Sequence, residues 1–575
     1  MKYVEDVKMS LGEIRRAQVI STYGPGSLIP IDDESFMIAG IDSWFDQGNP
    51  DPSLEIRESR LESHLGVDQF VLPPSGESAN SRDLPVVRFP MFYTCTSCQK
   101  LDVHYRIADK DGQCVCGKRL VTSRFITICN SGHVGEFPYS RWVHQGEKTD
   151  ESHKLTMYNE GRSSGLSDIV VACSCGMKKN MGGALGRSAL RGVTKCFGNQ
   201  PWIVNSVVSE CDQQPRAVQR GASNVWQAVT SSAISIPPWS SDANKFVDRY
   251  WTVFKNTPVA ALEGTVKGML DERPMPFGLE EALGAIENRR RIANGEPMKL
   301  ETMRSQEYEA LGRTTPENRP DSDFICRKPQ ESEVIPSGLS LLHLVTRLRE
   351  VRALKSFYRL TSGQDGDVIE SPLSGSRKWW LPAIEVSGEG LFLKLDIEKL
   401  KTWESHPKVV KRVQLLQKER GDNPLLKEIP ATSPRLVLVH TLAHVLIDQW
   451  SLECGYPAAS LRERIYVDED MAGLLIYTAT SDSQGSLGGL VGMAKGGRFD
   501  VSFREAINRT SWCSNDPLCI ESGPNGYESL NLGACHSCVI LPETCCEFRN
   551  ILLDRGLIVG TPDGTPGFFS ELIEE

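Results

Sequence analysis

The sequence predicts an α+β multidomain protein with zinc-ribbon-like N-terminal modules, a helical insertion and a C-terminal α/β zinc-binding domain. Three observations support this prediction. At 575 residues the chain is too long for a single hydrophobic core. Its 17 cysteines fall in short clusters with the spacing of metal ligands. Its hydrophobic and charged contents, 40% and 24%, are those of an ordinary globular protein.

We expect six successive regions along the chain, because the cysteine clusters alternate with stretches of different composition. They are an N-terminal α/β segment (1–90), a zinc ribbon (91–125), a second zinc-binding region (126–238), a helical insertion (239–335), a mixed α/β core (336–430) and a C-terminal zinc-binding domain (431–575).

The composition predicts a cytoplasmic protein. Residues 1–10 are charged and lack the apolar core of a signal peptide. The most apolar helix candidate, 436–447, is too short to cross a bilayer. In a reducing compartment the cysteines are metal ligands or buried thiols, not disulfides. The net charge of −10 argues against a protein that coats nucleic acid, although a local basic groove is compatible with it.

The first 90 residues do not indicate a nucleotide-binding site. Residues 11–20 suit a short helix, and Gly24-Pro25-Gly26 predicts a tight turn before a strand at 36–40. A glycine-rich turn with Ser and Thr suggests a phosphate cradle, but the sequence contains no G-x-x-x-x-G-K-[ST] motif. We therefore expect no nucleotide hydrolysis by this chain alone.

Two cysteine pairs predict the first zinc site. Cys95 and Cys98 form a C-x-x-C pair, and Cys114 and Cys116 form a C-x-C pair after a hairpin-like insert. Two such knuckles on short strands are typical of a zinc ribbon. A closed site of four cysteines contributes folding energy and rarely performs chemistry.

Residues 126–225 hold the ligands of a second site. Four ligands are available from Cys173, Cys175, Cys196 and either His153 or Cys211. A further pair, Cys129 and His133, lies at i, i+4. It suits either another metal or a hydrogen-bonded turn, and we favour the turn.

Cations of the same region are candidates for contact with DNA phosphates. They are Lys178, Lys179, Arg187, Arg191 and Arg220. The alternative is a solvated basic face without a ligand.

The middle of the chain predicts helices and strands without a site. Interleaved charges predict helices over 279–291 and 303–311, with a loop at 314–322. From Ser340 an apolar stripe at helical spacing predicts an amphipathic core helix. Strands are expected at 379–382 and 388–395, joined by a glycine turn. A helix is expected to carry Lys408, Lys411 and Arg412.

The last cysteine-rich stretch predicts the C-terminal zinc site. Six cysteines fall within 34 positions: Cys513, Cys519, Cys535, Cys538, Cys545 and Cys546. Thiolates two residues apart turn back on one metal ion, and a second pair nearby closes a tetrahedral site. Buried free thiols are the alternative, but so many in a short polar stretch favour zinc.

Three polar residues on the apolar helix upstream form a separate candidate. His440, His444 and Asp448 lie at i, i+4 and i+8, as metal ligands or a proton relay would. The zinc-protease motif requires Glu after the first histidine, where this chain has Thr441. We favour hydrogen-bonded interior histidines. A buried strand at 475–478 is expected to run into a glycine loop at 481–490, whose amides suit an anion.

Several of these stretches resemble the DrmB family, the zinc-rich partner protein of the DISARM anti-phage defence system. The resembling segments are 15–26, 129–133, 220–224, 348–354, 440–444, 487–490 and 513–555. The C-terminal part also resembles the zinc-binding domain of MrfA-type DNA-repair helicases. The resemblance implies zinc ligands at Cys519, Cys535, Cys538 and Cys546, with Cys513 as a substitute. Cys545 and His153 depart from the family's pattern.

The resemblance implies a non-catalytic zinc-binding subunit that binds the DISARM helicase DrmA and helps it engage DNA, single-stranded or end-containing. Two alternatives remain. One is a metal-dependent nuclease or hydrolase that uses His440, His444 and Asp448, which needs an open metal position and an activated water. The other is an architectural scaffold without DNA contact.

Overall fold

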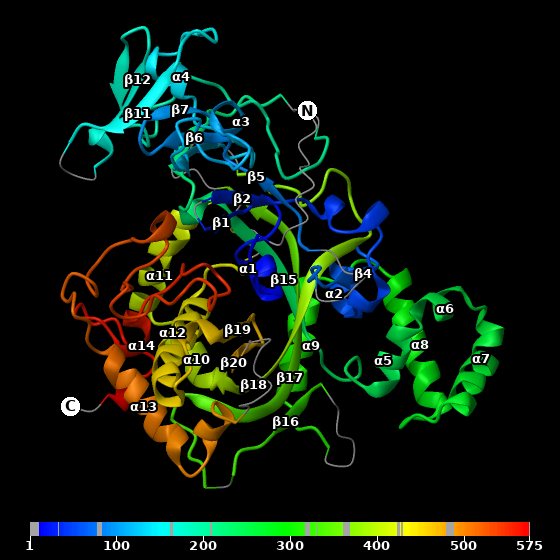
Figure 1. The fold of residues 1–575 in the computed structure, drawn as a ribbon. Helices are drawn as coiled ribbons and strands as arrows, with labels where there is room; N and C mark the ends of the chain where they lie inside the picture. The colour runs from blue at the N-terminus through cyan, green and yellow to red at the C-terminus, as the bar shows by residue number, and fades with distance from the viewer. Residues whose placement is uncertain are drawn as a thin grey trace. The chain divides into compact units, whose positions relative to one another are not determined.

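The structure, a computed structural model, describes residues 11–32, 34–76, 83–161, 165–206, 210–316, 323–330, 332–359, 368–421, 426, 429–478 and 488–573. The chain forms two compact units, each assembled from segments that are not contiguous in sequence (Figure 1). The first comprises Met1–Ile56, Val67–Ser231 and Arg352–Ile384. The second comprises Arg57–Gly66, Ser232–Val351 and Glu385–Glu575. This interleaving was not part of the six regions expected along the sequence.

The first unit is built from small antiparallel sheets. Its largest sheet has the order β13-β12-β11-β7-β6-β8, and two smaller sheets have the orders β1-β2-β5 and β10-β9-β14. The strands are β1 (Leu28–Ile31), β2 (Glu34–Ile38), β5 (Val86–Arg88), β6 (Phe92–Cys95), β7 (Lys100–Val103), β8 (Leu120–Thr122), β9 (Phe125–Ile128), β10 (Val134–Glu136), β11 (Leu155–Asn159), β12 (Ile169–Cys173), β13 (Lys178–Asn180) and β14 (Arg216–Gln219). The strands are short, so little apolar surface is available to each sheet.

Short helices and one parallel pairing complete the first unit. The helices are α1 (Arg16–Ser21), α3 (His104–Ile107) and α4 (Tyr139–Val143). β3 (Glu55–Ile56) pairs with β4 (Gln69–Val71), and β4 runs parallel to the first residues of β18 (Trp380–Leu395). The helix expected at 11–20 begins only at Arg16, because Arg15 has extended backbone angles. The expected turn is present, with Gly26 at φ 81°.

The second unit contains the helical insertion. Its helices are α5 (Asp242–Arg249), α6 (Trp251–Asn256), α7 (Val259–Glu272), α8 (Leu279–Asn294) and α9 (Leu300–Leu311), so the helices predicted at 279–291 and 303–311 are confirmed. α2 (Ser59–Leu65) belongs to the same unit and contacts α8. Arg289 of α8 pairs with Glu62 of α2 and, at 3.2 Å, with Asp248 of α5. Residues 317–322 of the expected loop lie outside the described residues.

The helix α12 and most of a long-stranded sheet form the main core of the second unit; the first residues of β15 and β18 and the last residues of β17 belong to the first unit. The sheet has the order β15-β17-β18-β20-β19, with β16 paired to β17. The strands are β15 (Gln227–Ile234), β16 (Ile325–Arg327), β17 (Leu339–Tyr358), β19 (Leu461–Val467) and β20 (Ala472–Thr478). The helices are α10 (Ile397–Glu404), α11 (Pro407–Arg420), α12 (Pro434–Cys454), α13 (Arg498–Thr510) and α14 (Gly556–Val559). α12 contacts β19, β20 and α13.

Local signals set the ends of α12. The Ser433 hydroxyl accepts a hydrogen bond from the Leu436 amide at 3.1 Å, and Pro434 occupies the first helical turn. Gly455, with φ 71° and ψ 19°, ends the helix in the left-handed conformation. Sixteen of its residues are buried, which confirms the prediction of a core helix. None of the helices that the structure describes is long and apolar enough to span a bilayer.

The helix predicted from Ser340 is wrong: this stretch is the strand β17. It has hydrogen-bonded neighbours on both edges and is buried on both faces for most of its length. When apolar residues occupy both faces of a strand, a subset of them falls at i, i+3, i+4 spacing by coincidence. Tertiary pairing then overrides the helical pattern.

Other elements near the core agree with the sequence in part. The strands expected at 379–382 and 388–395 are one continuous strand, β18, so the glycine turn between them is wrong. Gly390 lies against the β20 backbone, where a Cβ would come within 2.6 Å of the Ile476 carbonyl oxygen. The buried strand at 475–478 and the basic helix α11 are confirmed. Residues 479–487 of the glycine loop lie outside the described residues.

Candidate metal centres

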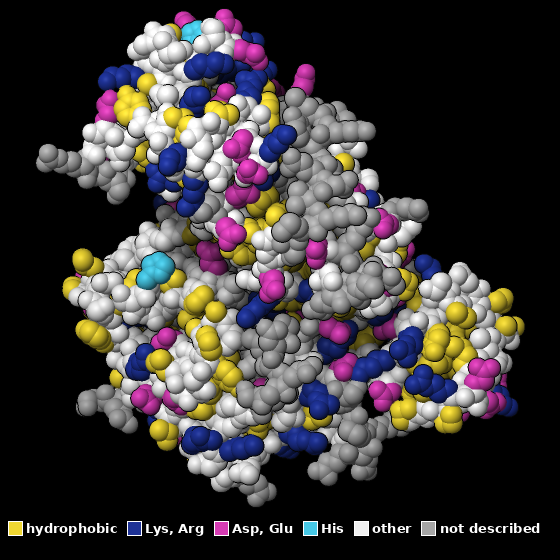
Figure 2. All heavy atoms as spheres, in the orientation of Figure 1, with side chains coloured by type: hydrophobic (Ala, Val, Ile, Leu, Met, Phe, Trp, Pro, Cys, Tyr) yellow, Lys and Arg dark blue, Asp and Glu magenta, His cyan; other side chains and the backbone are white. Residues whose placement is uncertain are grey.

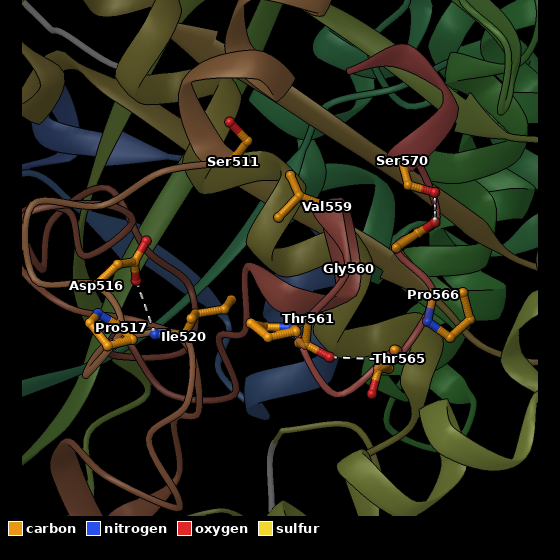
Figure 3. A pocket seen from close by; sticks show the side chains of 13 residues that line it. Ser511, Asp516, Pro517, Ile520, Val559, Gly560, Thr561, Thr565, Pro566 and Ser570 are labelled. Atoms are coloured by element: carbon orange, nitrogen blue, oxygen red, sulfur yellow. Dashed lines mark hydrogen bonds between the residues drawn. The ribbon is translucent and has the colours of Figure 1, made fainter. Parts of the chain in front are cut away.

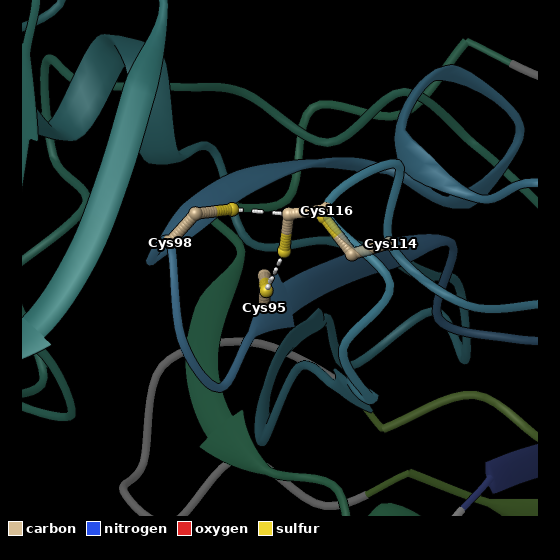
Figure 4. Close-up of side chains that lie close together, drawn as sticks. All are labelled: Cys95, Cys98, Cys114 and Cys116. Carbon is tan, nitrogen blue, oxygen red and sulfur yellow. Dashed lines mark hydrogen bonds between the residues drawn. The ribbon is translucent and has the colours of Figure 1, made fainter.

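The cysteines of the predicted zinc ribbon converge on one point (Figure 4). This cluster, cluster A, consists of Cys95 at the end of β6, Cys98 in the turn after it, and Cys114 and Cys116 in the loop before β8. The Sγ atoms of Cys95 and Cys116 lie 3.5 Å apart, and those of Cys98 and Cys114 lie 3.6 Å apart. β6 pairs with β7 and β8, and this pairing brings the two knuckles together.

The second zinc-binding region contains two clusters where the sequence suggested one. Cluster B groups Cys129, His133, Cys196 and Cys211, and cluster C groups His144, His153, Cys173 and Cys175. The expected grouping of Cys196 with Cys173 and Cys175 is therefore wrong. The strands decide the partition: Cys173 ends β12 in the six-stranded sheet, whereas Cys129 follows β9 of a different sheet.

Cluster B is built around the Cys129 to His133 turn. The turn itself is real, since the Cys129 amide donates to the His133 carbonyl oxygen at 3.2 Å. Its side chains also meet Cys196, whose Sγ lies 3.7 Å from that of Cys129 and 3.6 Å from His133 Nδ1. Cys211 completes the group, with its Sγ 4.0 Å from that of Cys129. The hydrogen-bonded turn and a group of potential metal ligands thus occur in the same segment.

Cluster C combines two thiols with two imidazoles. His144 Nε2 lies 3.4 Å from Cys175 Sγ, and His153 Nδ1 lies 3.3 Å from Cys173 Sγ. His144 Nδ1 lies 2.7 Å from the Ser140 carbonyl oxygen. That contact makes Nδ1 the protonated nitrogen and leaves the Nε2 lone pair directed at the cluster.

Cluster D lies in the C-terminal stretch and contains cysteines only: Cys513, Cys519, Cys535 and Cys538. Its Sγ separations are 3.5 Å for Cys513–Cys535, 3.7 Å for Cys519–Cys538 and 3.6 Å for Cys535–Cys538. Placing Cys546 in this group, as the resemblance implied, is wrong. The fourth member is Cys513, because the chain turns away after Cys538 and carries Cys546 to the α12 helix. Cys545 belongs to none of the described clusters.

Buried ion pairs hold the loops of cluster D. Arg555 pairs with Asp516, whose carboxylate also accepts a hydrogen bond from the Cys513 amide at 2.9 Å. Arg412 of α11 binds Asp554 through two hydrogen bonds of 2.6 and 2.9 Å. The loop from 511 to 555 has little regular structure, so these ion pairs and the cysteines fix its path.

The three side chains considered for a hydrolase do not lie together in the structure. His440 and His444 are fully buried and lie with Glu463 of β19 and Cys546, a group named cluster E. Asp448 is about half exposed and lies 3.1 Å from Arg509. The expectation that Asp448 shares their site is wrong, because eight residues at 3.6 per turn rotate it by roughly 80° from His440.

The donor geometry of clusters A to D fits a metal ion. A tetrahedral site with metal–sulfur bonds of about 2.3 Å separates its sulfurs by roughly 3.8 Å, close to the 3.5–3.7 Å found in clusters A and D. A disulfide would need about 2.05 Å. In each cluster at least one sulfur also faces an amide two residues ahead. Examples are Ser97 to Cys95, Gly198 to Cys196 and Ser537 to Cys535, each at 3.4 Å.

These amides favour the thiolate form, which is the form that binds metal. The Met177 amide, aided by His144, lowers the pKa of the Cys175 thiol to about 6. Burial opposes ionisation of Cys95, but hydrogen bonds from the Ser97 and Cys98 amides outweigh it and lower its pKa to about 6. The same balance lowers the pKa of Cys535 to about 6, with the Asn515 side chain the largest favourable contributor. Clusters A, C and D thus each contain a thiol that ionises near neutral pH.

The cations predicted to contact DNA lie beside clusters B and C. Lys178, Arg187 and Arg191 are exposed. Lys178 lies 3.3 Å from Glu160, and the Lys179 ammonium lies 3.6 Å from the centre of the Trp142 ring. Arg220 is only partly exposed, and burial lowers its pKa. Figure 2 shows Lys and Arg side chains over the region of β11, β12 and α4.

A hollow of about 750 Å³ lies beside cluster D (Figure 3). Asp516, Pro517 and Ile520 line one side, and the Thr561 to Gly567 turn lines the other. Asp516 is the one titratable residue among the described lining residues, and its carboxylate is engaged by Arg555. The hollow therefore offers no acid–base pair for catalysis.

Sequence reasoning missed two members of these groups. His144 could have been found from the sequence, because the C-x-C pair at Cys173 needs two more ligands and His144 and His153 both lie upstream of it. Glu463 gave no signal, because it stands between Arg462 and Arg464 in a strand and looks like part of a charged surface. Only the packing of α12 on β19 brings it to the histidines.

Clusters of Cys and His on short strands and loops fit the class of metal-binding proteins, and comparison with known proteins agrees. Residues 442–539, which include all of cluster D, match the MrfA Zn-binding domain, and residues 15–227 match a domain of unknown function, DUF8724. DISARM protein DrmB of Bacillus paralicheniformis (strain ATCC 9945a / NCIMB 11709 / CD-2) is 31% identical over 561 residues, which cover 92% of this chain and 97% of that protein. The chain belongs to the DrmB family of DISARM proteins.

A solved structure of the DUF1998 helicase MrfA bound to DNA is similar to part of this chain. The likeness covers 38% of this chain and 24% of that chain, with 12% identity and a TM-score of 0.20. A score this low gives no information about shared arrangement, so the link to MrfA rests on the sequence match at the C-terminus.

Proposed function

We propose that the chain is a non-catalytic subunit of a DISARM defence complex, that it binds Zn²⁺ at clusters A to D, and that it helps the helicase DrmA engage single-stranded or end-containing DNA. Family membership supports the defence role. Each cluster supplies four protein donors, the closed arrangement typical of structural zinc. Zinc then keeps loops rigid that have few apolar residues of their own.

The observation that carries the DNA-binding part is a local reversal of charge. Residues 91–200 contain 15 Lys and Arg against 9 Asp and Glu, a net of +6 in a chain of net −10. Between 169 and 209 there is no acidic residue and there are five cations. Residues 91–200 include all the potential ligands of clusters A and C and all of those of cluster B except Cys211, so zinc at these clusters would hold this basic segment rigid. A fixed array of cations binds phosphates without reading sequence.

A salt-titrated binding assay tests the DNA contact. The complex with DrmA is titrated with single-stranded DNA at several salt concentrations, and the Arg187→Ala/Arg191→Ala variant is compared with Lys267→Ala/Lys411→Ala. The control removes two exposed cations from helices outside the segment. We expect the first variant to lower the slope of log K against log salt by about 1.4, which is two single-strand contacts, and the control to leave it unchanged.

Equal effects of the two variants would contradict the assignment of the basic segment. A chain that binds DrmA but adds nothing to DNA binding would be the architectural scaffold. DNA cleavage by the isolated chain that chelator stops and His444→Ala abolishes would favour the hydrolase.

The helicase contact is supported by exposed apolar side chains at cluster D. Trp512 and Leu518 precede the ligands Cys513 and Cys519 and are 70% and 82% exposed. Figure 2 shows hydrophobic side chains over the loops that Figure 1 colours orange to red. An aromatic and an aliphatic side chain on a metal-fixed loop form the usual kind of anchor for a protein partner.

Co-purification tests this contact. We expect Trp512→Ala/Leu518→Ala to weaken the association with DrmA at least tenfold, because hot-spot anchors each contribute about 2 kcal/mol or more. Val259→Ala, which truncates an apolar side chain that is 77% exposed on α7, is the control and should co-purify normally. Normal association of the double variant would place the helicase interface elsewhere.

A further inference from the structure

Cluster E is a second, chemically different meeting point of potential ligands in the C-terminal part of the chain. It joins three elements far apart in sequence: His440 and His444 from α12, Glu463 from β19, and Cys546 from the loop after cluster D. The four donor atoms all lie within 4.8 Å of one another. Three of the four residues are at most 2% exposed, and Cys546 is partly buried.

We propose that cluster E is a fifth metal site, in which His440, His444, Glu463 and Cys546 bind one divalent cation of the Zn²⁺ class. Two neutral imidazoles, one carboxylate and one thiolate balance the charge of such an ion. Mixed nitrogen, oxygen and sulfur donors suit zinc, which accepts all three in tetrahedral geometry.

The distances fit this assignment. His440 Nε2 lies 3.2 Å from Cys546 Sγ and 3.2 Å from Glu463 Oε1, and His444 Nε2 lies 3.6 Å from Glu463 Oε2. Donors bound to one tetrahedral zinc are separated by roughly 3.3–3.6 Å, given bonds of about 2.0–2.3 Å. The side chains are therefore already at the spacing that a shared ion requires.

Three buried atoms of this cluster lack a hydrogen-bond partner among the described residues: His440 Nδ1, on the far side of its ring from the cluster contacts, and His444 Nε2 and Glu463 Oε2, which face each other. The other imidazole nitrogen of His444 lies 2.7 Å from the Val539 carbonyl oxygen and therefore carries the proton. The lone pair of His444 Nε2 then faces Glu463 Oε2, and the two electron-rich atoms repel each other. A buried cation between the two atoms satisfies both.

The hydrogen bonds that Cys546 accepts resemble those of cysteines in the other clusters. Its Sγ accepts hydrogen bonds from the amides of Phe548 and Asn550, each at 3.2 Å, which repeats the amide two residues ahead seen in clusters A, B and D. Three cysteines outside the clusters make a different contact, one that Cys538 of cluster D also makes, at 3.5 Å to the Cys535 carbonyl oxygen. The thiols of Cys545, Cys454 and Cys326 donate to backbone carbonyl oxygens, at 3.0, 3.6 and 3.4 Å, as neutral groups do.

Glu463 is positioned by its own contacts. Its Oε1 accepts a hydrogen bond from the Glu547 amide at 2.9 Å, and otherwise the carboxylate faces the two imidazoles. The alternative to a metal is a buried ion pair between Glu463 and a protonated His440. That pairing leaves the His444 lone pair and the thiolate-type contacts of Cys546 unexplained.

The adjacent cysteines provide a matched test on the full-length chain. Metal content per chain is measured by native mass spectrometry and elemental analysis for the unchanged protein, Cys546→Ser and Cys545→Ser. We expect five ions in the unchanged chain, four in Cys546→Ser and five in Cys545→Ser. Four ions in the unchanged chain, or an unchanged count in Cys546→Ser, would overturn the proposal.

A measurement on the unchanged protein covers the case in which Cys546→Ser does not fold. Crystals are examined by anomalous diffraction above and below the zinc absorption edge. A peak of zinc scattering among the four side chains is expected. Strong peaks at clusters A to D without one at cluster E would refute a fifth site.

Discussion

Cluster A and cluster E differ most in what surrounds them. The hydrophobic cluster at cluster A has five buried residues, Tyr93, Cys95, Ile107, Cys114 and Leu120, two of which are the metal-ligand candidates themselves. Cluster E lies on α12, inside a continuous core that also includes α11, α13 and β19. In the first case a metal would replace a hydrophobic core. In the second it would join elements that a core already holds.

The comparison explains why the protein combines short-stranded ribbons with one long apolar helix. A segment of thirty residues buries too little apolar surface to offset its conformational entropy, so it needs a staple. A helix such as α12, with sixteen buried residues, does not. The four predictions below test this difference.

Removal of metal should have the largest effect, and it should be uneven. After treatment with a strong chelator we expect the amides of β6, β7 and β8 to lose nearly all protection from hydrogen exchange, because structural zinc contributes about 10–16 kcal/mol to the folding of small modules. Amides in the middle of α12 should remain protected. Hydrogen-exchange mass spectrometry measures both regions in one sample. Equal loss in the two regions would show that the apolar core does not support α12 independently.

Substitution of single buried cysteines should distinguish metal ligands from ordinary buried thiols. Cys114→Ser should release one zinc ion and unfold the ribbon locally, since oxygen replaces a soft ligand in a closed site. Cys326→Ser is the control: Cys326 is equally buried but donates to the Leu311 carbonyl oxygen, a bond that a hydroxyl can also make. Its cost should be about 1–2 kcal/mol with unchanged zinc. Zinc analysis and exchange at β7 distinguish the two.

Truncation of the apolar helix should show the reverse pattern. Leu442→Ala removes a fully buried side chain from α12 and should cost about 2–5 kcal/mol, measured by denaturant unfolding of the second unit. Zinc bound at clusters A to C should not change, because those ligands belong to the first unit. Loss of zinc from the first unit would mean that the two units unfold together.

The smallest effect should come from Glu136 in β10. Burial raises the pKa of this carboxyl to about 7, although the Met91 and Phe92 amides oppose the shift. A carboxyl with a raised folded-state pKa binds its proton more tightly when folded, so stability should fall as pH rises from about 4.5 to about 7. The slope is at most ~1.4 kcal/mol per pH unit. Glu136→Gln should lack this contribution, and denaturation curves at pH 5 and pH 7 measure the difference. An equal pH dependence in both proteins would assign the titration to another group.

The sequence by itself determined the chemistry of the cysteine-rich segments. Knuckle spacing marks ligands because two residues between thiolates let the backbone fold over one ion, and this local rule placed Cys95, Cys98, Cys535 and Cys538 in their groups. The core character of α12 was equally visible, since its apolar residues cover every face. These properties depend on neighbours in sequence.

Only the tertiary structure decided which distant residues meet. Cys196 lies with Cys129 and not with Cys173, because Cys129 and Cys173 belong to different sheets. Cys546 leaves its neighbouring cysteines for a helix a hundred residues earlier, and Glu463 becomes its partner through the packing of β19 on α12. The stretch from Ser340 became a strand because partners on both edges satisfy its backbone. Long-range pairing leaves no local pattern, so contacts of this kind cannot be read from spacing alone.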